Sequence, residues 1–88
     1  MARDRRVTCA NHDRYGDITH IGNPHDWGIV TKDEAIYHIE NDIYRCYVQA
    51  PGTSPTYIEV VNGPTGKYLR TEPDGDPRNN LDNLPECH

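Results

Sequence analysis

The sequence contains no phenylalanine, one tryptophan and one methionine among its 88 residues, and only 34% of the residues are hydrophobic. The core must therefore be built from Ile, Val and Leu, from Trp27, and from some of the six tyrosines. A buried tyrosine needs a partner or water for its hydroxyl group, so the edges of such a core are expected to be wet. A chain of this length predicts one domain, residues 1–88, with a single core and one modest binding face.

Positive charge is also scarce. Nine Lys and Arg stand against fourteen Asp and Glu, which gives a net charge of -5. Such a balance opposes non-specific binding to nucleic acid, because that binding depends on cations that displace counterions from phosphates. Arg3, Arg5 and Arg6 form a small basic cluster, which we interpret as part of a charged, flexible leader over residues 1–5.

Cysteine and long apolar runs are few as well. Three cysteines, an odd number, do not suggest a disulfide framework of a secreted protein. No apolar run is long enough to span a bilayer, and the N-terminus lacks the hydrophobic region of a signal peptide. We therefore expect a cytoplasmic protein with reduced thiols and no membrane contact.

The clearest element in the sequence is a helix from Lys32 to Asn41. Thr31 and Glu34 have the spacing of a capping box, in which the threonine hydroxyl accepts from the Glu34 amide. Acidic residues in the first turn suit the helix dipole. One stripe of the helix is apolar and comprises Ala35, Ile36, Ile39 and Ile43.

Strand patterns surround the helix. Arg5–Ala10 alternates as a half-buried strand does, and further apolar segments occur at residues 18–21, 27–30, 44–48, 57–61 and 67–71. The last three are joined by short turns, which predicts an antiparallel meander with Leu69 inward. The predicted fold is α+β, with an antiparallel sheet of about four to five strands, one amphipathic helix on one face, and an irregular segment over residues 72–88. Leu81 and Leu84 are expected to dock that segment.

Several motifs together resemble the DUF3892 family, a group of small prokaryotic proteins of unknown function. They are Ile18-Thr19-His20-Ile21-Gly22, Trp27, Glu34-Ala35-Ile36, Ile39-Glu40, Tyr47-Val48, Tyr68-Leu69-Arg70-Thr71, Asn79-Asn80-Leu81 and Leu84-Pro85-Glu86-Cys87. The resemblance extends from about Val7 to Cys87. It implies a compact single domain of bacterial or phage type and no particular activity. Where the family has a glycine after the helix, this chain has Asn41-Asp42, so Asn41 is expected to end the helix in a left-handed conformation.

Metal-ligating residue types occur near both ends of the chain. Cys9, His12, Cys87 and His88 could supply the four ligands of a zinc site, but an adjacent Cys-His pair is an awkward half of such a site. Cys9 and Cys87 could also form a disulfide, which a cytoplasmic setting disfavours. The favoured interpretation is that Cys9 packs in the core and that the chain holds no metal or cofactor. Asp74-Gly75-Asp76, which faintly resembles a calcium loop, is interpreted as a turn.

No catalytic motif is present, and the protein is not expected to be an enzyme. His20, His25 and His38 are scattered, and each is better explained by a structural hydrogen bond or a solvated position.

The outer sheet face is the candidate binding surface. If Leu69 points inward, the residues beside it point outward, and tyrosine together with arginine is enriched at interaction hot spots. The predicted binding residues are Tyr47, Tyr57, Tyr68 and Arg70 on the sheet, with Asn79 and Asn80 in the loop that follows.

Three functions remain open at this point. The leading hypothesis is a non-catalytic protein-interaction or regulatory module that holds another protein or a second copy of itself. The alternatives are a nucleic-acid-binding module that uses the same face with the N-terminal arginines, and a small metal-binding protein or enzyme that uses His20 or Cys9, His12 and Cys87.

Overall fold

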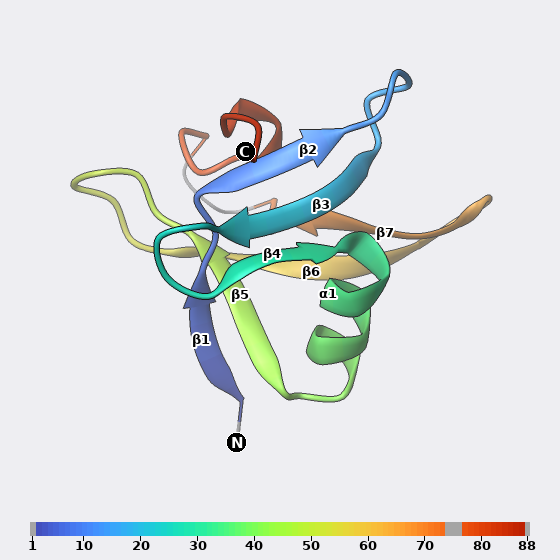
Figure 1. Ribbon diagram of the computed structural model, residues 1–88, viewed down its shortest axis with the longest axis horizontal. Coiled ribbons are helices and arrows are strands. Elements are labelled where there is room, and N and C mark those ends of the chain that lie inside the picture. The colour runs from blue at the N-terminus through green and yellow to red at the C-terminus, as the bar shows by residue number, and fades with distance from the viewer. Residues whose placement is uncertain (1, 74–76, 88) are drawn as a thin grey trace.

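The computed structural model describes residues 2–73 and 77–87 of the chain (Figure 1). In that part it has an α+β fold, as the sequence predicts. The elements are β1 (Arg3–Arg6), β2 (Cys9–His12), β3 (Ile18–Asn23), β4 (Gly28–Thr31), α1 (Lys32–Glu40), β5 (Tyr44–Val48), β6 (Thr56–Gly63), β7 (Gly66–Thr71) and the 3-10 helix η1 (Leu81–Asn83).

The strands form two sheets where the sequence predicted one. The order is β1-β5-β6-β7 in the four-stranded sheet and β2-β3-β4 in the three-stranded sheet. The pairing of β1 with β5 is parallel, whereas the other pairs, including the predicted meander from β5 to β7, are antiparallel.

The segment predicted as one strand, Arg5–Ala10, is divided between the two sheets. The amide of Val7 donates to Tyr47 of β5 at 2.8 Å, and the next amide, that of Thr8, donates to Gly22 of β3 at 2.9 Å. Side-chain alternation continues through this switch, so the sequence pattern does not reveal it. The flexible leader expected over residues 1–5 is also absent from Arg3 onward, because Arg3–Arg6 form strand β1.

Helix α1 confirms the predicted N-terminus. The Glu34 amide donates to the Thr31 hydroxyl at 3.2 Å, and the helix begins at Lys32. Its C-terminus differs from the prediction: Asn41 has φ −97°, and the left-handed residue is Asp42, with φ 56°. The left-handed residue that follows the helix thus lies one position later in the chain than expected.

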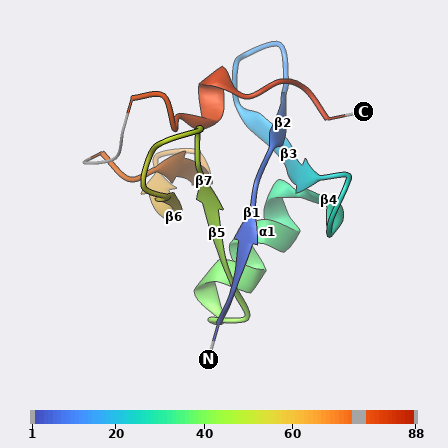
Figure 2. The ribbon, with the colours of Figure 1, turned by 90° about the vertical axis from the view of Figure 1, so that its left-hand side faces the viewer.

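The core lies between the helix and the two sheets. Figure 2 shows β1 and β5 side by side in front of α1, with β3 and β4 to one side. The buried residues of the core are Val7, Ala10, Ile18, Ile21, Ala35, Ile36, Cys46, Val48, Ile58, Leu69 and Leu81. The inward position predicted for Leu69 is confirmed, at 4% exposed.

The C-terminal segment is docked, as predicted. Leu81 is 2% exposed and Leu84 packs against the core. The Ala10 amide donates to the Pro85 carbonyl at 3.0 Å, so this segment is hydrogen-bonded to the outer edge of β2 at this residue. The loop residues Asp74, Gly75 and Asp76, interpreted above as a turn, lie outside the described residues.

The expectation of reduced thiols is wrong for two of the three cysteines. Cys9 and Cys87 form a disulfide with an S–S distance of 2.02 Å, and Cys46 is free and buried. This is the pairing that was considered above and disfavoured because of the expected cytoplasmic setting; it forms because the docked C-terminal segment brings Cys87 against β2. No helix in the described part of the chain is long and apolar enough to cross a membrane.

Candidate functional site

The outward side of the four-stranded sheet carries the predicted tyrosines and arginines of the sheet. Because Cys46, Ile58 and Leu69 point into the core, their neighbours along each strand point away from it. We call this surface the tyrosine–arginine face. Its members are Arg45, Tyr47, Tyr57, Glu59, Tyr68 and Arg70.

Two tyrosines form the centre of the face. Tyr47 and Tyr57 are directly opposite each other in the β5–β6 register, and their ring centroids are 6.0 Å apart at an angle of 58°. The guanidinium carbon of Arg45 lies 4.1 Å from the centroid of the Tyr57 ring, which is a cation–π arrangement. Each ring is therefore held by a neighbour on the adjacent strand.

Strand β1 extends this network. The Tyr57 hydroxyl donates to Asp4 Oδ2 at 3.1 Å. This hydrogen bond raises the pKa of Tyr57 above its ordinary value of 10.0, with smaller contributions from burial and from the charge of Asp4. The contact with Asp4 thus favours the protonated hydroxyl and directs it toward β1.

An ion pair occupies the β6–β7 side of the face. Arg70 and Glu59 are opposite each other in the register, and Arg70 Nε donates to Glu59 Oε1. This hydrogen bond raises the pKa of Arg70 above its ordinary value. Tyr68 is 41% exposed, and its ring lies so close over Gly63 that a Cβ there would be 3.0 Å from Tyr68 Cε1.

The two predicted asparagines do not belong to this face. Asn79 is 1% exposed; its oxygen accepts from the Ala50 amide, and its nitrogen donates to the Ser54 carbonyl at 2.9 Å. Asn80 is exposed and caps η1 by accepting from the Asp82 amide at 3.0 Å. Asn79 therefore holds the loop between β5 and β6 and is not accessible to a partner.

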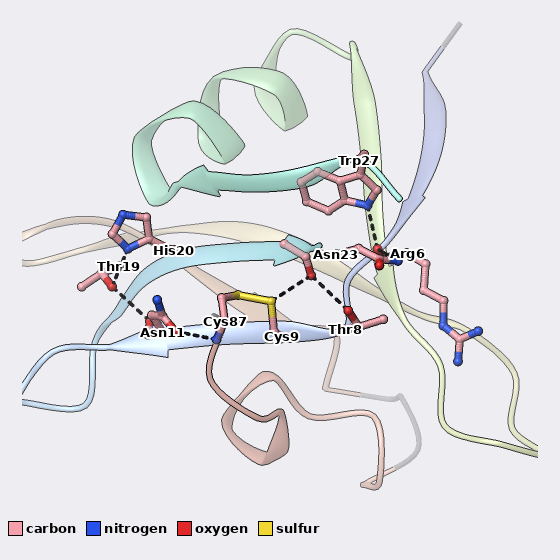
Figure 3. Close-up of a disulfide and its surroundings, with 10 residues drawn as sticks. Arg6, Thr8, Cys9, Asn11, Thr19, His20, Asn23, Trp27 and Cys87 are labelled. Atoms are coloured by element: carbon pink, nitrogen blue, oxygen red, sulfur yellow. Dashed lines mark hydrogen bonds between the residues drawn. A yellow bond between two sulfur atoms is a disulfide. The ribbon is translucent and has the colours of Figure 1, made fainter. Parts of the chain in front are cut away.

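The four residues weighed as zinc ligands do not form a metal centre among the described residues. Cys9 and Cys87 are bonded to each other in the disulfide, which Figure 3 shows between β2 and the C-terminal segment. His12 Nε2 lies 3.2 Å from Asp82 Oδ1. His88 lies outside the described part of the chain, within which no group of three or more metal-ligating side chains is found.

The histidines considered for catalysis are dispersed. His20 Nδ1 is hydrogen-bonded to the hydroxyl of Thr19 at 2.9 Å, and that hydroxyl donates to the Asn11 carbonyl at 3.3 Å (Figure 3). His38 packs edge-on against Tyr44, with centroids 5.2 Å apart. Each of these two rings has a structural contact on its own side of the molecule.

Arg5 makes an aromatic contact that the sequence pattern does not indicate. The guanidinium carbon of Arg5 lies 3.3 Å from the centroid of the Tyr44 ring and 4.8 Å from that of Trp27. The Trp27 indole donates to the Arg6 carbonyl at 2.7 Å (Figure 3). Arg5 is therefore a half-buried structural residue, and the basic cluster expected in the leader is reduced by one accessible charge.

The family model described as "Protein of unknown function (DUF3892)" matches residues 6–85 of the chain. No curated protein and no solved structure matches.

Proposed function

The chain belongs to the DUF3892 family, whose function is unknown, and we propose that it is a non-catalytic protein-interaction module that pairs with a second copy of itself through the tyrosine–arginine face. The observation that carries the proposal is the cross-strand network of this face. Arg45 lies over Tyr57, Tyr57 is bound to Asp4, and Arg70 is paired with Glu59. Contact side chains that are already held in place lose little conformational freedom on binding.

The choice of a second copy rests on charge. The face and its β1 border carry both signs, with Arg45 and Arg70 beside Asp4 and Glu59. In a two-fold dimer the same surface meets itself, so it must present both partners of each complementary contact. Tyrosine and arginine supply the large contact area typical of hot spots. A stable interface needs about 800 Å² from each partner. This is a small share of the whole accessible surface, which is 5737 Å².

The nucleic-acid alternative has less support. Of the three N-terminal arginines it relied on, Arg5 is stacked between Tyr44 and Trp27, and Arg6 donates to the Gln49 carbonyl at 2.7 Å. The net charge of -5 opposes phosphate binding as well.

Sedimentation equilibrium and light scattering across micromolar to millimolar concentrations test the proposal. The wild-type protein is expected to dimerise. The double variant Arg45→Ala/Tyr47→Ala, which removes two members of the face, is expected to weaken the dimer at least tenfold. Circular dichroism and thermal melting establish that the variant is folded.

The β2–β3 loop offers a matched control. Arg14 and Tyr15 also form an exposed arginine–tyrosine pair, with the Arg14 guanidinium carbon 4.9 Å from the ring centroid, but they lie away from the face. Arg14→Ala/Tyr15→Ala should leave the dimer unchanged. A wild-type protein that is monomeric throughout, or equal weakening by both double variants, overturns the proposal. Retardation of single-stranded DNA that the Arg45→Ala/Tyr47→Ala variant abolishes would replace it with the nucleic-acid function.

A further inference from the structure

A second surface feature lies on another side of the molecule, between α1, the start of β3 and the β6–β7 hairpin. It is a groove of about 450 Å³, which we call the helix–hairpin groove. Ile18 and Ile36, each 8% exposed, lie at its base. A smaller hollow of about 280 Å³ lies beside the N-terminal turn of the helix, shares Asp17, Ile18, Lys32 and Asp33 with the groove, and is also lined by Asp13. We call the groove and this hollow together the channel.

Carboxylates dominate the rim of this channel. Its lining includes two lysines, Lys32 and Lys67, and four carboxylates, which are Asp13, Asp17, Asp33 and Glu40. Lys67 is already neutralised, because its ammonium group lies 2.7 Å from Glu40 Oε2. This ion pair joins the end of α1 to β7.

The remaining carboxylates are only partly engaged. Asp13 Oδ1 accepts from the amides of Tyr15 and Asp17 at 2.8 and 3.1 Å. Within the described residues, the side chains of Asp17 and Asp33 form no hydrogen bond or ion pair. Both residues line the groove and the smaller hollow, together with Lys32 and Ile18. The channel therefore combines an apolar base with an excess of negative charge that the protein does not neutralise itself.

We propose that the helix–hairpin groove binds a cationic, extended peptide segment that carries an aliphatic side chain between lysine or arginine residues. The aliphatic side chain covers Ile18 and Ile36, which supplies the apolar contact. The flanking cations have long, flexible stems and reach Asp17 and Asp33 at the rim. Opposite charge at the rim also speeds encounter and excludes acidic segments.

This proposal is independent of self-association, because the groove and the tyrosine–arginine face share only Tyr68 among their members. The test is therefore run on the Arg45→Ala/Tyr47→Ala variant as well as on the wild-type chain. If the protein does not dimerise, peptide binding can still be measured. If the peptide does not bind, dimerisation can still be measured.

The probe is a synthetic acetylated and amidated peptide, Lys-Leu-Lys-Leu-Lys, titrated into isotope-labelled protein and followed by NMR. Shifts of backbone amide signals are expected to concentrate at Asp17, Ile18, Asp33 and Ile36. Two further peptides separate the contributions: replacing leucine by serine should weaken binding severalfold, and replacing lysine by glutamate should abolish it. The affinity should also fall as salt is added.

A pair of double variants gives the decisive comparison. Asp17→Asn/Asp33→Asn removes two charges at the rim and should weaken the peptide about tenfold, since each exposed charge pair contributes a factor of a few. Asp26→Asn/Glu86→Gln removes the same number of exposed charges elsewhere and should change the affinity less than twofold. Equal loss in both variants, shifts spread over the whole surface, or undiminished binding of the serine peptide each overturns the proposal.

Discussion

Asn79 and Asn80 are consecutive in the chain, but one is buried and the other is exposed. The Asn79 side chain accepts from the Ala50 amide and donates to Thr53, Ser54 and Thr56, so it joins the C-terminal segment to the β5–β6 connection. The Asn80 side chain caps its own short helix by accepting from the Asp82 amide. The same residue type thus fixes long-range structure at one position and local structure at the next.

This difference predicts unequal costs for the two alanine variants. Asn79→Ala leaves the buried partners of that side chain unsatisfied and should lower the free energy of unfolding by about 2–4 kcal/mol. Asn80→Ala removes one exposed cap and should cost about 1 kcal/mol or less. Urea denaturation of the two variants measures both values, and similar losses would contradict the assignment.

The disulfide predicts a redox-dependent stability. Cys9 and Cys87 are 78 residues apart in sequence, so the crosslink restricts most of the unfolded chain. Cys9→Ser/Cys87→Ser should lower the free energy of unfolding by about 2–5 kcal/mol. Urea denaturation with and without a reductant measures the effect.

The free energy of unfolding of the wild-type chain should fall in the reductant, whereas that of the double serine variant should stay the same. Intact mass should show the oxidised protein lighter by two hydrogens. A wild-type mass with three thiols, or identical stability in both conditions, would show that the crosslink does not form.

Cys46 is expected to be unreactive in the folded protein. Burial raises the pKa of its thiol from 9.0 to about 11, while the charge of Arg5 opposes this in part. Because the folded value is the higher one, this group contributes stability that is full below pH 9 and is lost as the pH rises toward 11.

Iodoacetamide at pH 8 should label the oxidised native chain very slowly. Unfolding in urea should expose one thiol without reductant and three with it, and rapid labelling of the native chain would contradict the burial of Cys46.

The contact between Tyr57 and Asp4 predicts a titration shift. Asp4→Asn removes the carboxylate acceptor and its charge, so the pKa of Tyr57 should fall toward 10.0. The raised pKa contributes stability that is present below pH 10 and declines as the pH rises through the folded value. NMR of tyrosine labelled with carbon-13 follows this titration. Asp13→Asn, in the β2–β3 loop, is the control and should leave the pKa of Tyr57 unchanged.

Local structure could be predicted from the sequence where neighbouring residues decide it. The Thr31 cap and the apolar positions Ala35, Ile36 and Ile39 were sufficient to locate α1 to within one residue at its C-terminus. The fourth residue of the predicted stripe, Ile43, lies beyond the end of the helix and is 39% exposed. Alternation around Leu69 was sufficient to predict which side of β7 faces the core. In both cases the determining side chains lie within one turn or one strand of each other.

Long-range arrangement could not be predicted in the same way. The change of sheet at Val7 and Thr8 preserves side-chain alternation and alters only the hydrogen-bond partner. The approach of Cys87 to Cys9 depends on how the final segment crosses the domain, and the burial of Asn79 depends on the position of the β5–β6 connection. For the candidate site, the sequence indicated the outward tyrosines and arginines, but the contact of Asp4 with Tyr57 required the parallel β1–β5 pairing.

The position of Leu81 in the core has a consequence for synthesis of the protein on the ribosome. Residues 79–87 supply a buried leucine, a buried side-chain amide and one half of the crosslink, and they accept a hydrogen bond from the edge of β2. A nascent chain whose residues around Leu81 are still in the exit tunnel therefore exposes part of its apolar interior. Until residues 79–87 have emerged from the tunnel, that interior stays open to chaperones and proteases.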